Sequence, residues 1–339
     1  MKARVTLEDV GRLVGVSGVT VSNVINHRGG TSAATQAKVW AAVEATGYVA
    51  DPAARRLAGG KTDTVGVLVP NLSTQYASET IRGVSEALGA AGLDLLVSTT
   101  QGAASERRQA SFLAKLTDGL LFLLPHEGRD EHQDDLRTFD LHGGPRVAIE
   151  YRGEGHLLPT VNIDDYGGTR QAVRYLASLG HRRVGFIGGP PGRSAAEVRL
   201  RAYLETLAET GLEADPGLVA AGDFTQPAGF RAAHALLALP DPPTALFAAN
   251  DVSAFGAVEA VKDLGLRVPE DVSVVGFDDV PMASQVFPPL TTVRRPLEQM
   301  GRVGVALLLA RLRGEAVELG TVLPTALVVR SSSGPVPGG

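Results

Sequence analysis

The sequence contains no cysteine, and this absence excludes disulfides, thiolate catalysis and metal sites built on thiolates. It also agrees with a reducing compartment. Aromatic residues are scarce, at 5% of the chain, and Trp40 is the single tryptophan. The seven histidines are scattered, with no close pair at the spacing of metal ligands. We therefore expect structural or surface roles for the histidines, and neither a metal nor a cofactor.

Long apolar runs are missing as well. No stretch approaches the roughly 18 apolar residues of a membrane span, and the N-terminus lacks the apolar core of a signal peptide. We therefore expect a cytoplasmic protein without membrane contact. What the chain has instead is length: 339 residues, 44% of them hydrophobic, can bury the cores of two or three domains.

Charge is distributed unevenly along the chain. The net charge is −5, but residues 1–61 carry eight Lys or Arg against four Asp or Glu, a balance of +4, and the remainder carries −9. A small basic segment on an acidic body is typical of a DNA-binding module fused to a module that does not bind nucleic acid. The excess is modest, so it supports this assignment only together with a motif.

Residues 6–26, TLEDVGRLVGVSGVTVSNVIN, contain such a motif. They predict two short helices around a turn at Gly15, with Thr6 and Asp9 forming a capping box at the start. Ser17 opens the second helix. The outer face of that helix carries short polar groups that can meet phosphate oxygens or base edges, namely Thr20, Ser22, Asn23 and Asn26. The pattern resembles a helix-turn-helix whose second helix enters the DNA major groove; the alternative is a helical hairpin with a solvated polar face.

A third helix is predicted over residues 33–46, with Ser32 as its N-cap and Gly47 as its end. Its helical spacing favours a core position for Trp40. Residues 48–61 then predict a linker helix too short to be stable alone. Leu57 on this linker has two interpretations: ordinary packing onto the following domain, or a wedge inserted into a minor-groove base step.

From residue 63 the pattern alternates between apolar strands and helices of 10 to 15 residues, which is typical of parallel sheets covered on both faces. Eleven or so strands are too many for one such sheet, so we expect an α/β core of two doubly wound lobes that close like a clamshell. The predicted organisation is a headpiece over 1–47, a hinge-helix linker over 48–61, an N-terminal lobe over 62–161 and 291–322, and a C-terminal lobe over 162–290 and 323–332.

The carboxyl ends of the predicted strands carry polar and aromatic residues, and ligands of open α/β sheets bind beyond these ends. The residues found there are Asn71, Tyr76, Tyr151, Arg152, Asp164, Asp165, Phe224, Asn250, Asp251, Asp278 and Asp279. Amides and carboxylates can hold hydroxyls and aromatic rings can stack on a pyranose, so the set favours a sugar-like ligand. For any one residue, helix capping or a lobe–lobe hydrogen bond is an equal alternative.

Seven segments together resemble, in order over residues 4–330, the LacI/GalR family of bacterial transcription regulators. They are TLEDV…GVS…TVSNVIN, DPAARRLAGG, TVGVLVPNLS, LGHRRVGFIGGP, AANDVSAFGAVEA, VPEDVSVVGFDDVPMA and PPLTTVRRPLEQMG. The resemblance implies a core similar to type I periplasmic sugar-binding proteins and a repressor of carbohydrate-utilisation genes. It also implies a homodimer on a pseudopalindromic operator, whose operator affinity is controlled allosterically by a mono- or disaccharide effector between the lobes.

Carried over residue by residue, the resemblance implies base reading by Gly18, Val19 and Asn23. The other implied DNA contacts are Thr6, Ser17, Thr20, Ser22, Asn26, Ser32 and Thr35 in the headpiece and Ala54 and Leu57 in the linker. The family's ligand positions fall on Tyr76, Arg199, Phe224, Asn250 and Asp278, to which the strand ends add Asn71 and Arg152. Several family members have arginine at the position of Asn23, so a different operator base is expected, because Asn favours adenine and Arg favours guanine.

Two other classes of protein compete with this interpretation. A sugar-binding protein for transport shares the core fold, but it needs an export signal and has no use for residues 1–60. An enzyme is the second alternative, because GFIGGPPG follows a strand as a dinucleotide-binding loop does. That segment lacks the GxGxxG order and a partner acid, and the sequence offers no trio of nucleophile, base and orienting group. We therefore expect no enzymatic activity.

Overall fold

The structure is a computed structural model that describes residues 5–26, 29–48, 61–124, 144–152 and 158–336. The chain divides into two compact units, Met1–Asp63 and Thr64–Gly339, which we call the headpiece and the core. Within the described ranges, no helix combines the length and the apolar character that a membrane span requires.

Three helices make up the described part of the headpiece: α1 (Leu7–Val14), α2 (Gly18–Ile25) and α3 (Ala33–Thr46). The capping box predicted at the start of α1 is confirmed, since Thr6 and Asp9 each accept a hydrogen bond from the backbone N–H of the other. Gly15 ends α1 in the left-handed region at φ 76°, a conformation that favours glycine. The three helices bury a small core made of Val10, Val21, Val24 and Val39.

Trp40 is 43% exposed, so its predicted core position is wrong. Val39 is the fully buried residue of α3, and the neighbouring Trp40 lies about 100° further around the helix. The predicted linker helix, with Ala54 and Leu57, falls on residues 49–60, which lie outside the described residues.

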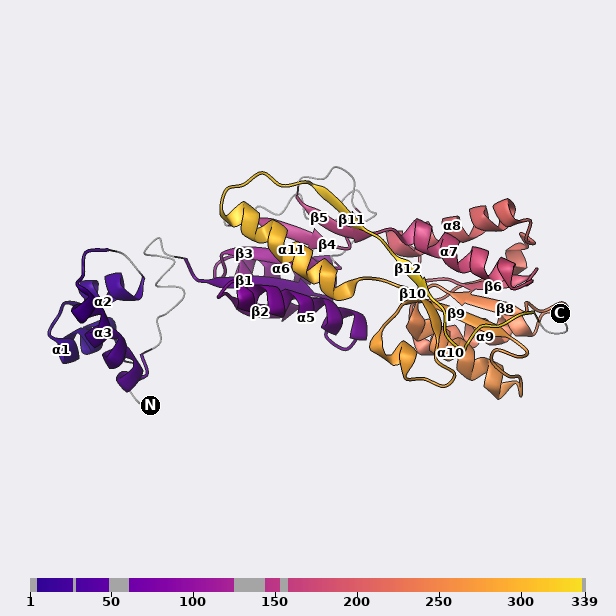
Figure 1. Ribbon diagram of the computed structural model, residues 1–339, viewed down its shortest axis with the longest axis horizontal. Helices are drawn as coiled ribbons and strands as arrows, with labels where there is room; N and C mark the ends of the chain where they lie inside the picture. The colour runs from indigo at the N-terminus through magenta and orange to yellow at the C-terminus, as the bar shows by residue number, and fades with distance from the viewer. Residues whose placement is uncertain (1–4, 27–28, 49–60, 125–143, 153–157, 337–339) are drawn as a thin grey trace. The chain divides into compact units, whose positions relative to one another are not determined.

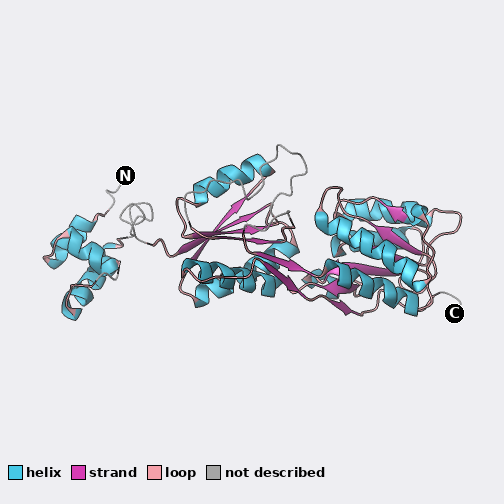
Figure 2. Ribbon diagram, turned by 90° about the horizontal axis from the view of Figure 1, so that it is seen from above, coloured by secondary structure: helices cyan, strands magenta, loops and turns pink. Residues whose placement is uncertain are grey.

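The first lobe of the core contains a six-stranded parallel sheet in the order β11-β5-β4-β3-β1-β2. Its strands are β1 (Thr64–Val69), β2 (Asp94–Thr99), β3 (Gly119–Leu123), β4 (Arg146–Ile149), β5 (Thr160–Ile163) and β11 (Gly320–Leu323). The helices of this lobe are α5 (Gln75–Ala90), α6 (Ala103–Leu113) and α11 (Leu297–Leu312). Figure 2 shows helices on both sides of the sheet.

The second lobe contains the other six-stranded sheet, in the order β12-β10-β9-β8-β6-β7. Its strands are β6 (Val184–Ile187), β7 (Val219–Ala220), β8 (Ala245–Ala248), β9 (Ser273–Asp278), β10 (Thr291–Arg294) and β12 (Ala326–Val328). The helices are α7 (Asp165–Ser178), α8 (Ser194–Thr210), α9 (Gln226–Leu237) and α10 (Asp251–Asp263), with the short 3-10 turns η1 (Pro216–Leu218) and η2 (Pro281–Ser284). All its strand pairs are parallel except β10 with β12.

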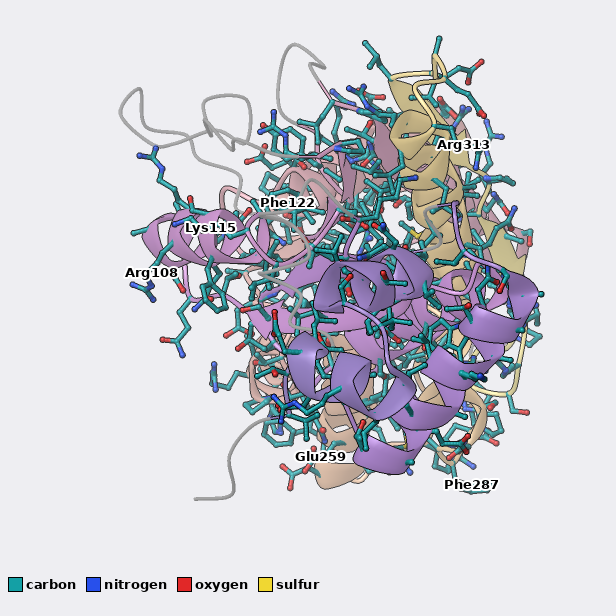
Figure 3. The ribbon with its side chains drawn as sticks, turned by 90° about the vertical axis from the view of Figure 1, so that its left-hand side faces the viewer. Arg108, Lys115, Phe122, Glu259, Phe287 and Arg313 are labelled. Atoms are coloured by element: carbon teal, nitrogen blue, oxygen red, sulfur yellow. The ribbon has the colours of Figure 1, made fainter. Side chains whose placement is uncertain are left out.

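Alternating strand residues build the apolar layers on either side of each sheet. In β1, Val65, Val67 and Val69 belong to the layer shared with α5 and α11, whereas Leu68 joins the layer under α6. Figure 3 shows the buried Phe122 of that second layer, with Arg108 and Lys115 of the α6 region pointing outward. In the second lobe, α7 and α8 cover one face and α9 and α10 cover the other. The two doubly wound lobes expected from the sequence are confirmed.

The helices α5 and α11 approach each other through glycine. A Cβ atom added at Gly83 would lie 2.1 Å from the carbonyl oxygen of Glu298, and one at Gly301 would lie 2.3 Å from that of Thr80. Neither distance is possible for real atoms, so both positions require glycine for the two backbones to touch. Because α11 comes late in the sequence, this contact ties the end of the chain to the first lobe.

The described chain passes between the lobes three times: from β5 into α7, from β10 into α11, and from β11 into β12. Figure 1 shows the last passage as the yellow pair β11 and β12 running from one lobe into the other. The expected boundary at residue 291 differs from the structure, because β10 pairs with β9 and β12 in the second sheet. The expected boundaries at 162 and 323 also differ, since residues 162, 163 and 323 pair in the first sheet.

Candidate functional site

The starts of the three headpiece helices carry hydroxyl side chains. Thr6 caps α1, Ser17 caps α2 by accepting from the Thr20 N–H at 3.2 Å, and Ser32 caps α3 by accepting from the Thr35 N–H at 3.2 Å. A helix N-terminus presents unpaired N–H groups and the positive end of the helix dipole, which favours a phosphate oxygen. The predicted phosphate-contacting hydroxyls therefore lie where the backbone also suits an anion.

The outer face of α2 combines one apolar and several polar side chains. Val19 is 70% exposed. Asn23 is half-buried, and Gly18 begins the helix without a side chain. Asn26 donates to the Ser22 backbone oxygen at 2.8 Å and to the Ser22 hydroxyl at 3.2 Å. The exposed Val19 side chain can contact a thymine methyl group, and the Asn23 amide can form hydrogen bonds with a base edge.

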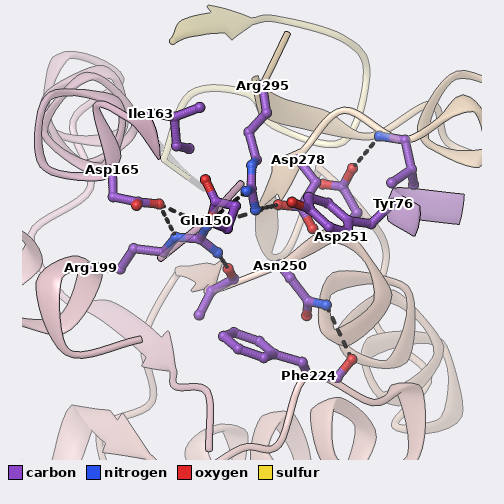
Figure 4. Close-up of polar contacts among 12 residues, drawn as sticks. Tyr76, Glu150, Ile163, Asp165, Arg199, Phe224, Asn250, Asp251, Asp278 and Arg295 are labelled. Carbon is purple, nitrogen blue, oxygen red and sulfur yellow. Dashed lines mark hydrogen bonds and ion pairs between the residues drawn. The ribbon is translucent and has the colours of Figure 1, made fainter. Parts of the chain in front are cut away.

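In the core, three residues at or beyond the carboxyl ends of strands have positive φ. Glu150 follows β4 at φ 62°, Phe224 follows the short β7 at φ 68°, and Asp278 ends β9 at φ 124°. None of the three is glycine, so each conformation is strained and must be held by its surroundings. Such strain gathers at ligand-binding sites. Figure 4 shows the three residues facing a common region between the lobes.

Arg199 of α8 is the largest of the fully buried side chains, with 2% exposed. Its Nε donates to Asp165 Oδ1 at 2.8 Å, and its Nη1 donates to the Ala249 backbone oxygen at 2.5 Å. The guanidinium lies 3.8 Å from the ring centroid of Phe277 and 6.0 Å from that of Phe224. The arginine is therefore fixed in orientation by hydrogen bonds and by two aromatic rings.

Arg295 lies where the chain passes from β10 into α11, and 5% of its side chain is exposed. Its Nη2 is 2.7 Å from Glu150 Oε2, and its Nη1 donates to Asp278 Oδ1 at 3.0 Å. The Tyr76 ring covers the guanidinium, with 4.6 Å between the guanidinium carbon and the ring centroid. Because Glu150 follows a strand of the first sheet and Asp278 ends a strand of the second, Arg295 connects the two lobes (Figure 4).

Arg152 makes a second ionic connection between the lobes. It follows β4, and its Nη2 donates to the Asp165 carboxylate at 2.5 Å and to the Ile163 backbone oxygen at 2.8 Å. Arg199 Nη2 also lies 4.0 Å from Asp278. Six side chains of alternating charge are thus linked by ion pairs, and the first and the last of them, Glu150 and Arg152, both follow β4. We call this set the charge ring, and its members in order are Glu150, Arg295, Asp278, Arg199, Asp165 and Arg152.

Burial and neighbouring charges act against each other in the charge ring. Burial raises the pKa values of Glu150 and Asp278 above the ordinary carboxyl range, although Arg295 opposes the shift at both. At Asp165, burial again acts to raise the pKa, but Arg199 and further arginines prevail and lower it. A buried ion-pair network of this kind is seldom stabilising overall compared with apolar packing. Its presence between two lobes therefore indicates a binding role more than a structural one.

A fourth buried carboxylate, Asp251, lies beside the ring at the start of α10. It accepts from the Thr292 hydroxyl at 2.5 Å and from the Val280 N–H at 2.9 Å. Burial, followed by the charge of Asp278, raises its pKa well above the ordinary aspartate range. Asp251 therefore holds the neighbouring backbone in place rather than supplying a free anion.

The structure brings together most of the predicted effector residues. Tyr76, Arg152, Arg199, Phe224, Asn250 and Asp278 all lie at or next to the charge ring. Asn250 also caps α10 and donates to the Phe224 backbone oxygen at 3.1 Å. Asn71 does not join them: it is exposed, and its side chain accepts hydrogen bonds from Ser73 in its own turn.

Sequence reasoning did not select Glu150 or Arg295. Glu150 is the charged end of an apolar strand and Arg295 is one of two arginines before a proline, so the printed sequence offered a weak signal for both. The signal became specific only when the two lobes placed the side chains 2.7 Å apart.

A helical headpiece of this kind joined to a two-lobed core with a buried polar site defines a class, the bacterial regulators that combine a helix-turn-helix with a periplasmic-binding-protein-like core. The comparisons with known proteins agree: a family model described as bacterial regulatory proteins, lacI family, matches residues 6–51, and one described as a periplasmic binding protein-like domain matches residues 173–333. The chain belongs to the lacI family of bacterial regulatory proteins.

Relatives cover nearly the whole chain. The HTH-type transcriptional repressor CytR of Escherichia coli strain K12 is 35% identical over 340 residues, covering 98% of this chain and 97% of that protein. The solved complex of the transcriptional regulator CelR with cellobiose is 36% identical over 97% of this chain and 100% of that one, with a TM-score of 0.73. The lac repressor dimer bound to operator and the anti-inducer ONPF is 29% identical, and the match covers 98% of this chain and 100% of that one, with a TM-score of 0.85.

Proposed function

We propose that this protein is a repressor of carbohydrate-utilisation genes that binds a pseudopalindromic operator as a homodimer and releases or tightens it when a sugar occupies the core. The observation that carries the proposal is the charge ring, a buried polar site between two lobes in a chain that also has a helix-turn-helix. The lac repressor dimer on its operator and the complex of CelR with cellobiose support the two halves of the proposal. Because operator DNA lies in the bacterial cytoplasm, we propose a cytoplasmic location, and we propose no enzymatic activity.

On the DNA side, we assign base reading to Gly18, Val19 and Asn23. The assigned contacts to the DNA backbone and minor groove are Thr6, Ser17, Thr20, Ser22, Asn26, Ser32, Thr35, Ala54 and Leu57. The capping hydroxyls of the three helix starts support the phosphate contacts. Because few side chains can read bases, sequence-dependent DNA deformation contributes a large share of the specificity.

On the effector side, we assign sugar contacts to Tyr76, Arg152, Arg199, Phe224, Asn250 and Asp278. Arginine and aspartate can hold adjacent hydroxyls in a bidentate manner, and the Phe224 ring can stack on a pyranose. Asn71 remains a proposed effector residue on the strength of its position after β1 alone, since its side chain accepts two hydrogen bonds within its own turn.

The proposed coupling follows from the position of the ring. A sugar that binds both lobes changes the contacts of Arg295 and Arg152, the two arginines that join the lobes. A coupling free energy of roughly 1–3 kcal/mol, typical of allostery, would change operator affinity about 5- to 150-fold. The effect on the operator is reciprocal, so operator DNA changes sugar affinity by the same factor.

The test uses the full chain, operator sequences selected from genomic DNA, and fluorescence anisotropy with a panel of neutral mono- and disaccharides. One sugar is expected to shift operator affinity at least 5-fold. Arg199→Lys should abolish the shift while leaving operator binding intact, and the matched control Arg201→Lys, exposed on the same helix, should respond as the wild type does. An Arg199→Lys protein with an unchanged sugar response would contradict the assignment.

A further inference from the structure

A pocket lies between the lobes, apart from the charge ring and beside the passage from β10 into α11. Its volume is about 420 Å³, within the range of small-molecule sites. Both lobes supply its walls: Glu79 of α5 and the first turns of α11 belong to the first lobe, whereas η2, Asp279, Arg294 and Arg330 belong to the second. Arg295 is the one member of the charge ring that lines it. We call it the crossover pocket.

The crossover pocket and the charge ring are built on different carboxylates. In the ring, Arg295 donates to Asp278. The residues next to these two in the sequence pair separately, since Arg294 Nε donates to Asp279 Oδ2 at 2.6 Å. Arg330 Nη2 donates to the other oxygen of Asp279, also at 2.6 Å. A molecule in the crossover pocket can therefore bind without replacing a contact of the ring.

Hydrogen-bond donors are in excess on the arginine side of the pocket. Both oxygens of Asp279 accept from arginines, and so do both oxygens of Glu298, from Arg82 at 2.5 Å and from Arg302 at 3.1 Å. Among the described residues, however, Arg294 donates only through Nε and Arg302 only through Nη1. A guanidinium has five N–H donors, so each of these two arginines can still bind an acceptor such as a carboxylate in a bidentate manner.

One acceptor in the pocket is also left over. Glu79 binds Arg82 through Oε2, whereas its Oε1 has no hydrogen-bond or ion-pair partner among the described residues. Apart from Arg295, whose charge is balanced in the ring, three arginines and three carboxylates line the pocket, so its formal charge is zero. A ligand with a net charge would add an ion without a counterion to this set, which is unfavourable. A molecule that carries one ammonium and one carboxylate adds none.

We propose that the crossover pocket is a second ligand site, which binds a small zwitterion such as an amino acid. The carboxylate of the ligand accepts from Arg294 and Arg302, and its ammonium donates to Glu79 Oε1. Because Arg294 belongs to the second lobe and Glu79 to the first, the ligand joins the lobes at a place other than the charge ring. The alternative is that water satisfies these groups and the pocket holds no ligand.

The experiment measures binding to the full chain by isothermal titration calorimetry at constant ionic strength. The probes are free glycine, β-alanine, γ-aminobutyrate and ε-aminohexanoate, in which the ammonium and the carboxylate lie progressively further apart. Propionate and propylamine, each with one of the two charges, are the comparison probes. Arg294→Gln and Glu79→Gln each remove one proposed contact. The matched control is Arg313→Gln: its side chain is 58% exposed, as that of Arg294 is, and it also donates from Nε to a carboxylate, but beyond the far end of α11.

One zwitterion of the series should bind with a Kd below about 1 mM, and neither singly charged probe should match it. Arg294→Gln should weaken this zwitterion about 10-fold, the lower end for a hydrogen bond to a charged group, because Arg294 is partly exposed. Glu79→Gln should weaken it by about the same factor, since it removes the partner of the ammonium. Arg313→Gln should bind it as the wild type does.

A wild type that binds no member of the series below about 1 mM would overturn the inference. Equal binding of propionate or propylamine would do the same, because one charge would then suffice. A zwitterion that binds all the variants equally has its site elsewhere in the chain, which also refutes the assignment. If one variant does not fold, as judged by its melting temperature, the other still tests its own half of the ligand. A sugar-responsive regulator would remain intact under each of these outcomes, because its test uses neutral sugars and operator DNA.

Discussion

Asp165 offers a direct measure of what the charge ring contributes to stability. Its carboxylate is buried and holds two arginines, Arg199 at 2.8 Å and Arg152 at 2.5 Å. Asp165→Asn keeps the shape but removes the charge, so the fully buried Arg199 is left with Asp278 at 4.0 Å as its nearest carboxylate. Breaking a buried ion pair by removing one partner costs about 3–5 kcal/mol. Asparagine can still accept one hydrogen bond, so we expect the lower end, about 3 kcal/mol.

The assay is differential scanning calorimetry of the full chain, following the transition of the core. At about 2.1 cal/mol/K of unfolding entropy per residue, a loss of about 3 kcal/mol lowers the melting temperature of the core, Thr64–Gly339, by about 5 °C. Glu209→Gln is the matched control, because Glu209 also binds two arginines, Arg170 at 2.8 Å and Arg174 at 2.9 Å, but at the surface. Solvent screens that pair of contacts, so its removal should leave the transition nearly in place. Equal shifts in the two variants would refute the claim that burial makes the ring costly to break.

Three further outcomes follow from single contacts. Gly83→Ala should destabilise the core by about 1–3 kcal/mol, because the added Cβ would lie 2.1 Å from the Glu298 carbonyl oxygen. The control Gly89→Ala in the same helix adds a Cβ that meets nothing within 4 Å, so it should stabilise the core. Urea unfolding measures both free energies, and a Gly83→Ala protein as stable as the wild type would contradict the close helix contact. Burial lowers the pKa of His181 below its ordinary value of about 6.5, so the unfolded chain binds the proton more readily than the folded chain. The stability of the core should therefore fall as the pH drops below about 6.5. Melting curves recorded across that pH range should show this fall in the wild type and lose it in His181→Gln. Asn23→Arg should change the preferred base from adenine to guanine in an operator selection, and an unchanged operator would reject the reading role of Asn23.

The headpiece was predictable because its signals are local. Serine is a common N-cap residue, because its side chain can accept a hydrogen bond from the amide three residues later. Ser17 and Ser32 therefore indicate two helix starts, and in the structure both are N-caps. Trp40 could not be placed in the same way. Val39 and Trp40 are both apolar, and the choice of which one faces the core depends on where α1 and α2 pack against α3, which the sequence of α3 alone does not contain.

The lobe boundaries depend on pairings between distant segments. The strand β10 has the sequence TTVR, three β-branched residues and an arginine, and nothing within it distinguishes the first sheet from the second. It joins the second sheet because β9 lies on one side and β12, which comes more than thirty residues later, on the other. Glu150 and Arg295 were missed for the same reason, since their contact spans the two lobes and no spacing in the sequence encodes it.

The charge ring also explains why both lobes are needed for one site. Two of its contacts, Arg295 with Glu150 and Arg152 with Asp165, join residues of the first-lobe side to the second lobe. Apolar packing would hold two lobes together at least as well as these ion pairs do. Apolar packing could not, however, exchange a contact between lobes for a contact with a hydroxyl. A ring of hydrogen-bonding charges can make that exchange, and each exchange at Arg295 or Arg152 alters a contact on which the relative position of the lobes depends. In the proposed function, effector binding and lobe position are thereby linked through the same two arginines, which is the physical requirement for an effector to change the DNA affinity of the headpiece.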